Sequence, residues 1–104
     1  MTTAAIILQQ LGGNRLIAMV GATHLIDHGD GLSFKFGRGL PHRRGLPNYC
    51  KITLDPSDTY TVELGRLYRR RGVLEYDQLA SFSGVYADML IQLFEDQTKL
   101  TTRL

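Results

Sequence analysis

Three segments in the middle of the chain alternate apolar and polar side chains, and this alternation limits the fold more than any other feature. It runs through residues 32–36, 49–54 and 59–67. A period of two is typical of strands that bury one face. Between the last two segments, Asp55-Pro56-Ser57-Asp58 places proline at the second position of a type I turn. We therefore expect these strands to be antiparallel neighbours in one sheet.

Further strands are predicted on both sides of this central group. Residues 15–20 are rich in strand formers and are followed by Gly21, which indicates a first strand. Residues 25–27 lead into the glycine-rich sequence 28–31, a strong hairpin signal. A basic turn at residues 68–72 precedes a weaker strand over residues 73–82.

Helices are predicted at the two ends of the chain. Thr3 is a suitable N-cap, residues 4–11 favour helix, and Gly12-Gly13 is a natural stop. From residue 85 to about residue 99, apolar side chains recur at steps of three and four, which predicts an amphipathic helix. The apolar positions are Val85, Tyr86, Met89, Leu90, Leu93 and Phe94. For the first helix they are Ile6, Ile7 and Leu11, with Gln10 on the same face.

The predicted fold is α+β: a single antiparallel β-sheet of about four or five strands, with a short N-terminal helix and a C-terminal amphipathic helix packed on it. The 104 residues form a single domain, 1–104, which excludes a large multi-site enzyme. No apolar stretch approaches the roughly 20 residues of a membrane span, and no basic segment opens the chain. We expect a cytoplasmic protein that does not insert into a membrane.

Several residue sets could be drawn as catalytic or metal sites, but none has the required spacing. His24 and His28 would lie roughly 13 Å apart on a strand, too far for one metal ion. The lone Cys50 lies in a predicted strand and is expected to be a buried hydrophobe rather than a nucleophile paired with His42. The glycines at 12–13 and 37–39 do not lead from a strand into a helix, as phosphate loops do.

Paired carboxylates are equally unspecific. Asp55 and Asp58 belong to a turn, while Glu75 and Asp77 alternate along a predicted strand. We therefore expect no enzyme activity, no catalytic residue, no metal and no cofactor.

The middle of the chain is strongly basic although the net charge is only +2. Between residues 35 and 71, nine Lys and Arg residues meet three Asp and Glu residues. Glycine and proline interrupt residues 37–48, which predicts a long basic loop. Because arginine forks bind phosphates and tyrosines stack on bases, the leading hypothesis is binding of DNA or RNA, with Tyr49 and Tyr68 beside the basic groups. The predicted nucleic-acid-binding residues are Arg38, Arg43, Arg44, Arg69, Arg70 and Arg71, with His42 in the same loop.

A protein partner is the alternative. The sequence pI of about 8.9 is lower than that of most dedicated nucleic-acid modules, and surface arginines also solubilise small domains. Acidic residues of the last helix, Asp88, Glu95 and Asp96, could mimic phosphates toward a basic groove of a host protein. An exposed sheet edge could also pair across the axis of a homodimer.

Three sequence blocks resemble a widespread family of small, uncharacterised proteins of bacteriophages and other bacterial mobile elements. The blocks are LGGNRLIAMVGA at residues 11–22, LSFKF at 32–36 and GVYADML at 84–90. Members of this family often carry Thr at the position of Val20, and a shorter, less arginine-rich stretch in place of residues 37–48. The resemblance implies a phage or prophage origin and action in the bacterial cytoplasm, either as a DNA-metabolism accessory or as an inhibitor of a host defence complex. It names no catalytic residue.

Overall fold

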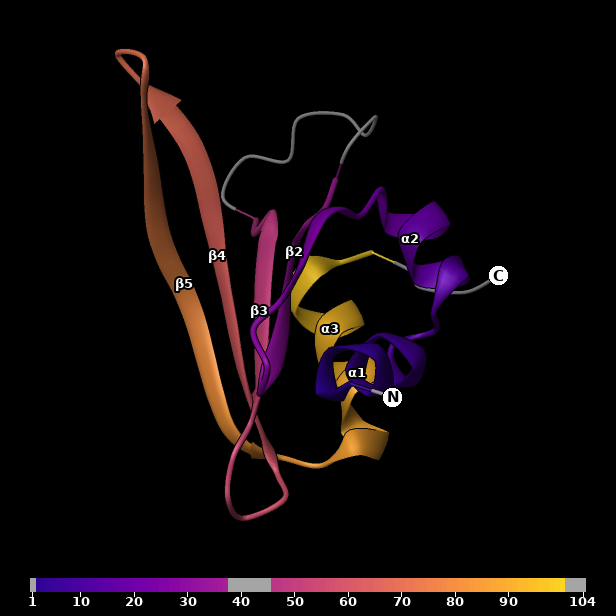
Figure 1. Ribbon diagram of the computed structural model, residues 1–104. Helices are drawn as coiled ribbons and strands as arrows, with labels where there is room; N and C mark the ends of the chain where they lie inside the picture. Colours follow the sequence, from indigo (N-terminus) through magenta and orange to yellow (C-terminus); the bar gives the residue numbers. More distant parts are fainter. Residues whose placement is uncertain (1, 38–45, 101–104) are drawn as a thin grey trace.

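The computed structural model describes residues 2–37 and 46–100. Two helices precede five strands, and a helical segment closes the described chain (Figure 1). The elements are α1 (Thr3–Gln10), α2 (Asn14–Val20), β1 (Thr23–Asp27), β2 (Gly31–Lys35), β3 (Tyr49–Leu54), β4 (Tyr60–Arg70), β5 (Val73–Val85), the 3₁₀ helix η1 (Ala87–Met89) and α3 (Leu90–Thr98).

The five strands form one antiparallel sheet in the order β1-β2-β3-β4-β5. Each strand therefore pairs with its neighbour in the sequence, as expected for short turns between alternating segments. The register places Leu32 opposite Ile52, and Ile52 opposite Val62, so one face carries a row of buried side chains. The predicted α+β class, with one antiparallel sheet between terminal helices, is confirmed.

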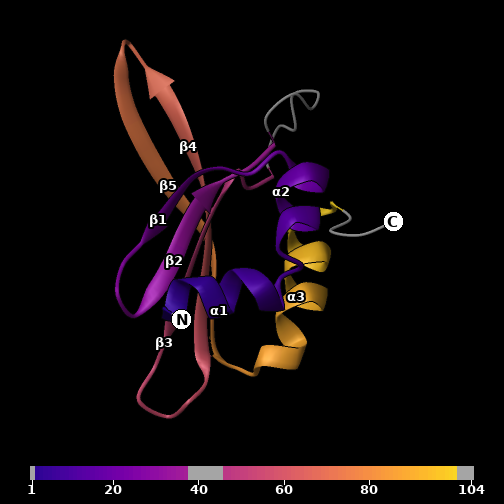
Figure 2. The same cartoon turned by 45° about the vertical axis from the view of Figure 1, so that its right-hand side comes forward.

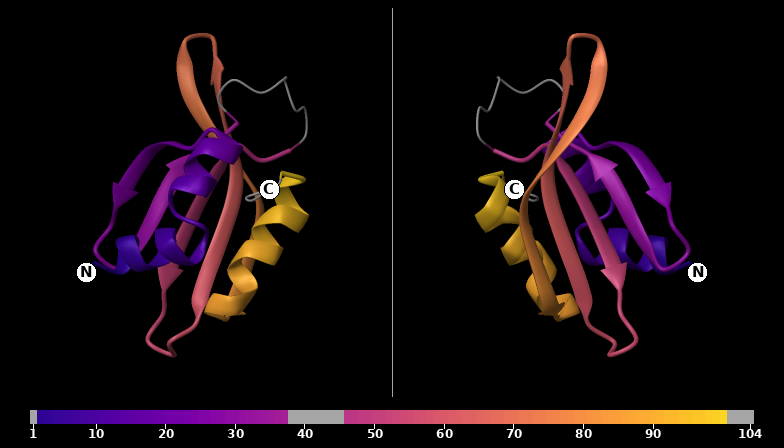
Figure 3. Two further views of the ribbon diagram at one scale, coloured as in Figure 1. Left: turned by 90° about the vertical axis from the view of Figure 1, so that its right-hand side faces the viewer. Right: turned by 90° about the vertical axis from the view of Figure 1, so that its left-hand side faces the viewer.

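All three helices pack against this apolar face of the sheet (Figures 1 and 2). The rings of Phe34 and Phe36 on β2 contact that of Phe94 on α3, with ring centroids 5.9 and 5.1 Å from the Phe94 centroid. In the described part of the chain, no helix lies on the opposite face of the sheet (Figure 3, right). The core therefore lies in a single layer between the sheet and the helices. We call the opposite face the open face.

The first helix forms as predicted, with a small shift of its cap and its buried face. Thr2, not Thr3, is the N-cap, and its hydroxyl accepts a hydrogen bond from the Ala5 amide at 3.1 Å. Ile7 is fully buried, whereas Ile6 is 38% exposed.

Residues 15–20 are helical, so the prediction of a strand there is wrong. Leu16 and Val20 are both buried while Ala18 between them is exposed, a spacing of four that fits a helix and not a strand. Gly21 ends α2 in the left-handed conformation, at φ 63°. Packing of one helical face outweighs the strand preference of Ile17 and Val20.

The last helix is shorter than predicted because β5 continues to Val85. The α-helix spans only Leu90–Thr98 and follows the single turn η1. Leu90 and Phe94 are buried as predicted. In contrast, Tyr86 and Met89 precede the α-helix and are 61% and 48% exposed.

Candidate nucleic-acid interface

The hairpin formed by β4 and β5 extends well beyond the rest of the sheet (Figure 1). The first residue of β3, Tyr49, pairs with Gly65, while β4 and β5 continue pairing as far as Arg70 opposite Val73. Past Leu67, no other strand of the described residues lies beside the hairpin on the β3 side. We call residues 68–75 the hairpin arm. Its exposed end brings the predicted residues Arg69, Arg70 and Arg71 to the surface.

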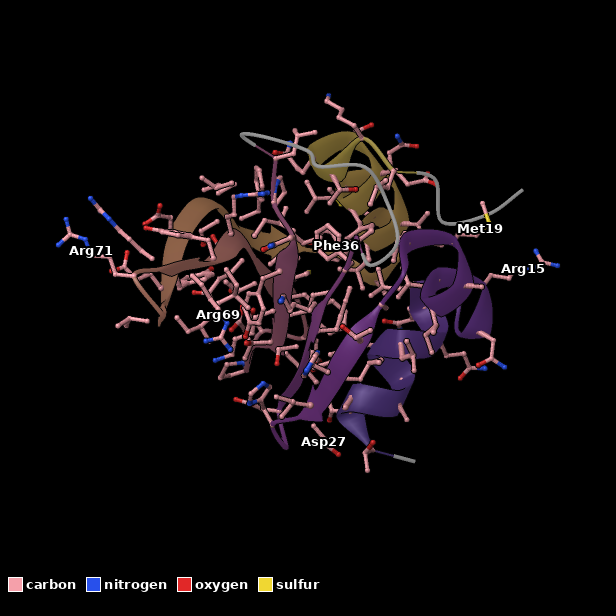
Figure 4. The ribbon with its side chains drawn as sticks, turned by 90° about the horizontal axis from the view of Figure 1, so that it is seen from above. Arg15, Met19, Asp27, Phe36, Arg69 and Arg71 are labelled. Atoms are coloured by element: carbon pink, nitrogen blue, oxygen red, sulfur yellow. The ribbon has the colours of Figure 1, made fainter. Side chains whose placement is uncertain are left out.

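The arm ends in a two-residue turn, Arg71-Gly72, which is tighter than the predicted turn over residues 68–72. Both residues have positive φ, 53° and 81°, as a type I′ turn requires. This turn matches the twist of the flanking strands, so the strands stay paired up to Arg70. Arg71 extends from the tip, far from Arg15 and Met19 on α2 (Figure 4).

The three arginines of the arm point in different directions. Because side chains alternate along a strand, Arg69 and Arg70 lie on opposite faces of the hairpin. Arg69 lies opposite the uncharged Leu74, and Arg70 lies opposite Val73. The arm therefore carries positive charge on both faces and at the tip.

Tyr68 does not join the basic surface as predicted. It lies opposite Glu75, and a hydrogen bond to the Glu75 carboxylate raises the pKa of Tyr68, with Asp77 adding to the effect. Its hydroxyl is therefore committed to carboxylates on the neighbouring strand. Since carboxylates repel phosphate, phosphates on this face of the arm should lie near Arg70 rather than near Tyr68.

The base of the arm is held by the last residues of the predicted basic loop. The Asn48 side chain donates to the Leu67 carbonyl at 2.9 Å and accepts from the Leu67 amide at 2.7 Å. The Arg66 guanidinium donates to the Leu46 carbonyl at 2.8 Å. These bonds stabilise the point from which the arm extends.

The other predicted basic residues, Arg38, His42, Arg43 and Arg44, lie outside the described residues. The described chain leaves β2 through Gly37 and returns at Leu46. Because neighbouring strands are antiparallel, the last residues of β2, the first residues of β3 and the last residues of β4 lie at the same end of the sheet. The topology therefore places both flanks of this segment at the end of the sheet that carries the arm.

The open face contains a shallow depression of about 330 Å³ beside the base of the arm. Tyr49 of β3 and Tyr76 of β5 form an edge-to-face pair there, with ring centroids 5.4 Å apart and an interplanar angle of 76°. Burial and the negative charge of Glu63 raise the pKa of Tyr76. The depression is lined by Tyr49, Lys51, Glu63, Leu67, Tyr76 and Gln78.

Gly65 explains why two tyrosines from non-adjacent strands can meet on this face. A β-carbon at Gly65 would overlap the ring of Tyr76. Without a side chain at this position of β4, the Tyr76 ring lies across the strand toward Tyr49. Sequence analysis named Tyr49 but missed Tyr76 and Lys51, because the tyrosines are 27 positions apart and only the sheet register brings them together.

The remaining candidate groups are structural. Cys50 is fully buried, and burial followed by the Glu63 charge raises the pKa of its thiol, so the predicted inert role agrees with its position. The His28 ring lies 2.7 Å from the Ser33 hydroxyl, and the His24 ring lies 3.0 Å from the Thr23 hydroxyl. Within residues 2–37 and 46–100, no group of three His, Cys, Asp or Glu side chains could hold a metal ion.

The acidic residues at the C-terminal end are spread over two elements. Asp88 is exposed in η1, and Asp96 is exposed in α3, where it accepts a hydrogen bond from Gln92 at 2.8 Å. Glu95 is half-buried. The prediction that all three carboxylates lie on the last helix is therefore wrong for Asp88.

No family model, curated protein or solved structure matches this chain. In the described part of the chain, no helix has the length and apolar character needed to cross a membrane. The functional argument therefore depends on the surface chemistry of the arm and the open face.

Proposed function

We propose that this protein is a non-enzymatic nucleic-acid-binding protein that contacts phosphates through its hairpin arm. The observation that carries the proposal is the projection of Arg69, Arg70 and Arg71 beyond the body of the sheet. Arginine binds phosphate bidentately and keeps its charge at every physiological pH. An arm with positive charge on both faces can contact phosphates while the rest of the sheet stays outside the interface.

The arginines of the 37–48 segment, Arg38, Arg43 and Arg44, extend the same proposal. The described residues on either side of these arginines, Gly37 and Leu46, lie at the end of the sheet that bears the arm. Clustered charge of one sign speeds association with a polyanion and strengthens binding at low salt. The family resemblance adds the context that we propose, which is the cytoplasm of a phage-infected bacterium.

The first experiment measures binding of fluorescein-labelled 12-nucleotide single strands and 12-base-pair duplexes by anisotropy. The variants Arg69→Gln and Arg70→Gln each remove one charge from the arm. Arg15→Gln is the matched control, because Arg15 is also exposed but lies at the far end of the molecule (Figure 4). We expect each arm variant to weaken binding severalfold and the control to bind like wild type. Equal affinity in all four proteins would contradict the proposal.

A triple variant, Arg38→Gln with Arg43→Gln and Arg44→Gln, tests the second basic segment separately. If both segments contact one nucleic acid, this variant also weakens binding, and combining it with Arg69→Gln weakens binding further. Wild-type affinity of the triple variant would restrict the interface to the arm.

A protein partner is the second candidate, and the outer edge of β5 favours it. β5 is an edge strand of 13 residues in the described sheet. Val73, Leu74 and Leu79 are 60%, 56% and 48% exposed. Long edge strands with exposed apolar side chains are templates for pairing with an extended segment of another protein.

Variants of this edge distinguish the two candidates. Val73→Thr with Leu74→Thr places β-branched threonine, a strand former, at both positions and removes apolar contact area. A protein that acts through this edge should lose a stoichiometric partner from nuclease-treated bacterial lysate in this variant and keep it in Arg69→Gln. Retention of the partner by the Thr variant would argue against the edge as its docking element.

A further inference from the structure

The open face beside the arm carries aromatic rings, which can stack on bases, and positively charged side chains, which can contact phosphates. This combination suits some classes of nucleic acid better than others. Arg69 lies two residues from Leu67 on β4, so the two side chains share the open face. Leu74 and Tyr76 stand opposite them on β5. Lys51 lies on the same face, opposite Glu63.

These groups form a continuous path. Arg69 lies six positions after Glu63 on β4, so the path along the strand is about 20 Å long. It begins at a guanidinium, passes the Tyr76 and Tyr49 rings, and ends at the Lys51 ammonium. A path of this length lies within the reach of a few nucleotides of a flexible single strand.

We propose that the open face of the sheet binds single-stranded nucleic acid, with a base stacked on Tyr76 and phosphates near Arg69 and Lys51. This inference rests on the proposed nucleic-acid function and narrows it to one class of ligand. A duplex keeps its bases paired and stacked inside, so it offers no free base face to a tyrosine. The depression between Tyr49 and Tyr76 would then add nothing to duplex binding.

Glu63 restricts which part of the strand can lie over the depression. Its carboxylate repels phosphate but accepts hydrogen bonds from the exocyclic amino groups of bases. The phosphates should therefore lie toward Arg69 and Lys51, and the base should point toward Glu63. Cytosine carries such an amino group and thymine does not, so the site should prefer cytosine.

The decisive variant is Tyr76→Leu, which keeps apolar volume but removes the aromatic face. Base stacking on an aromatic side chain is worth about 5- to 100-fold in affinity, so we expect a loss of this size for a 12-nucleotide single strand. Affinity for the 12-base-pair duplex should not change. Tyr86→Leu is the matched control, because Tyr86 is also an exposed tyrosine but lies outside the depression, and this variant should bind single strands like wild type.

Intrinsic fluorescence supplies a second readout. The chain has five tyrosines and no tryptophan, so its emission reports directly on tyrosine. A base stacked on Tyr76 should quench part of this emission in wild type, and the quenched part should be absent in Tyr76→Phe. Thermal unfolding of each variant shows whether the fold is retained.

The outcomes separate this inference from the proposed function. If Arg69→Gln weakens binding while Tyr76→Leu leaves single-strand affinity unchanged, the nucleic-acid function stands and the stacking site is overturned. Tighter binding of the duplex than of the single strand also overturns it. If wild type binds neither ligand, the proposed function itself fails. Tighter binding of oligo(dC) than of oligo(dT), lost in Glu63→Leu, which has no hydrogen-bond acceptor, supports the orientation of the base, and equal binding by wild type contradicts that orientation.

Discussion

The thiol of Cys50 lies in the core, on the side of β3 that faces the helices. Burial is the larger cause that raises its pKa above the usual 9.0, and the nearby Glu63 charge raises the pKa further. Because the folded pKa exceeds the unfolded one, the stabilisation from the neutral thiol is complete below about pH 9. It is lost as the pH rises toward the folded pKa. The buried position also protects the thiol from oxidation and alkylation.

We therefore predict that the free energy of unfolding falls as the pH rises above 9, and that Cys50→Ala reduces this fall. Urea titrations followed by circular dichroism at pH 7, 9 and 10.5 measure the effect. Tyr68 and Tyr76 also have raised pKa values, so their ionisation at higher pH also lowers the free energy of unfolding. The Cys50→Ala variant therefore keeps part of the pH dependence. Parallel pH profiles of wild type and Cys50→Ala would contradict the account.

Two glycines of the sheet differ in what surrounds them, and this difference predicts that alanine lowers stability by unequal amounts at the two positions. A β-carbon at Gly31 would overlap the Ile52 carbonyl, which is backbone and cannot move away. At Gly65 it would overlap only the ring of Tyr76, which can rotate. We expect Gly31→Ala to destabilise the fold by about 1–3 kcal/mol. Gly65→Ala should cost less stability but weaken single-strand binding. Equal loss of stability in the two variants, measured by urea unfolding, would contradict this reading.

For single residues, the sequence predicted which side chains are buried or exposed better than it predicted which side chains contact one another. Tyr49 and the arm arginines were predicted as surface groups, and Cys50 as a buried one. The pairing of Tyr49 with Tyr76 was not predictable, because it depends on the register of β3, β4 and β5 and on the missing side chain at Gly65. Such contacts are set by the sheet as a whole and leave no local pattern.

Among the elements, the hairpin arm contains an unusual residue at its tip. Arg71 adopts the left-handed conformation, which costs most L-residues about 1–2 kcal/mol and is better tolerated by asparagine. Arg71→Asn should therefore stabilise the protein by up to about 1 kcal/mol in urea unfolding. Arg71→Gln removes the same charge without relieving the backbone, and it should not stabilise the protein. Equal stability of the two variants would mean that the turn is unstrained.

The element that sequence analysis misassigned is α2. Ile17 and Val20 favour strands as single residues, and the segment is only seven residues long. The available signals were the spacing of four between Leu16 and Val20 and the glycines at both ends, Gly13 and Gly21. Short helices depend on tertiary packing rather than on propensity, so their local sequences are weak guides.

The strands were predicted more reliably because period-two alternation is local and independent of partners. Residues 49–54 match β3 without change. The boundary between β5 and the C-terminal helix was misplaced, because Val85, Tyr86 and Met89 continue the helical spacing of Leu90 and Phe94 by coincidence. Gly84, at φ 66°, lies where β5 shifts register against β4, close to the end of the strand.

For the whole molecule, the one-sided packing of the sheet explains where function can lie. All three helices cover one face, so the apolar side chains of that face are used for stability (Figures 1 and 2). The open face and the arm have no comparable structural role (Figure 3). Sequence analysis predicted the sheet and the covering helices, but it could not predict that β4 and β5 would extend beyond their neighbours. That extension separates the arm arginines from the body of the protein.

The salt dependence of single-strand binding tests the central claim most directly. Each arginine that neutralises a phosphate contributes about 0.7 to the slope of log K against log salt concentration. The account predicts a steep slope for wild type, and a slope about 2 smaller for the variant with Arg69→Gln, Arg70→Gln and Arg71→Asn. A wild-type affinity that does not change between 50 and 200 mM salt, or equal slopes for the two proteins, would contradict it.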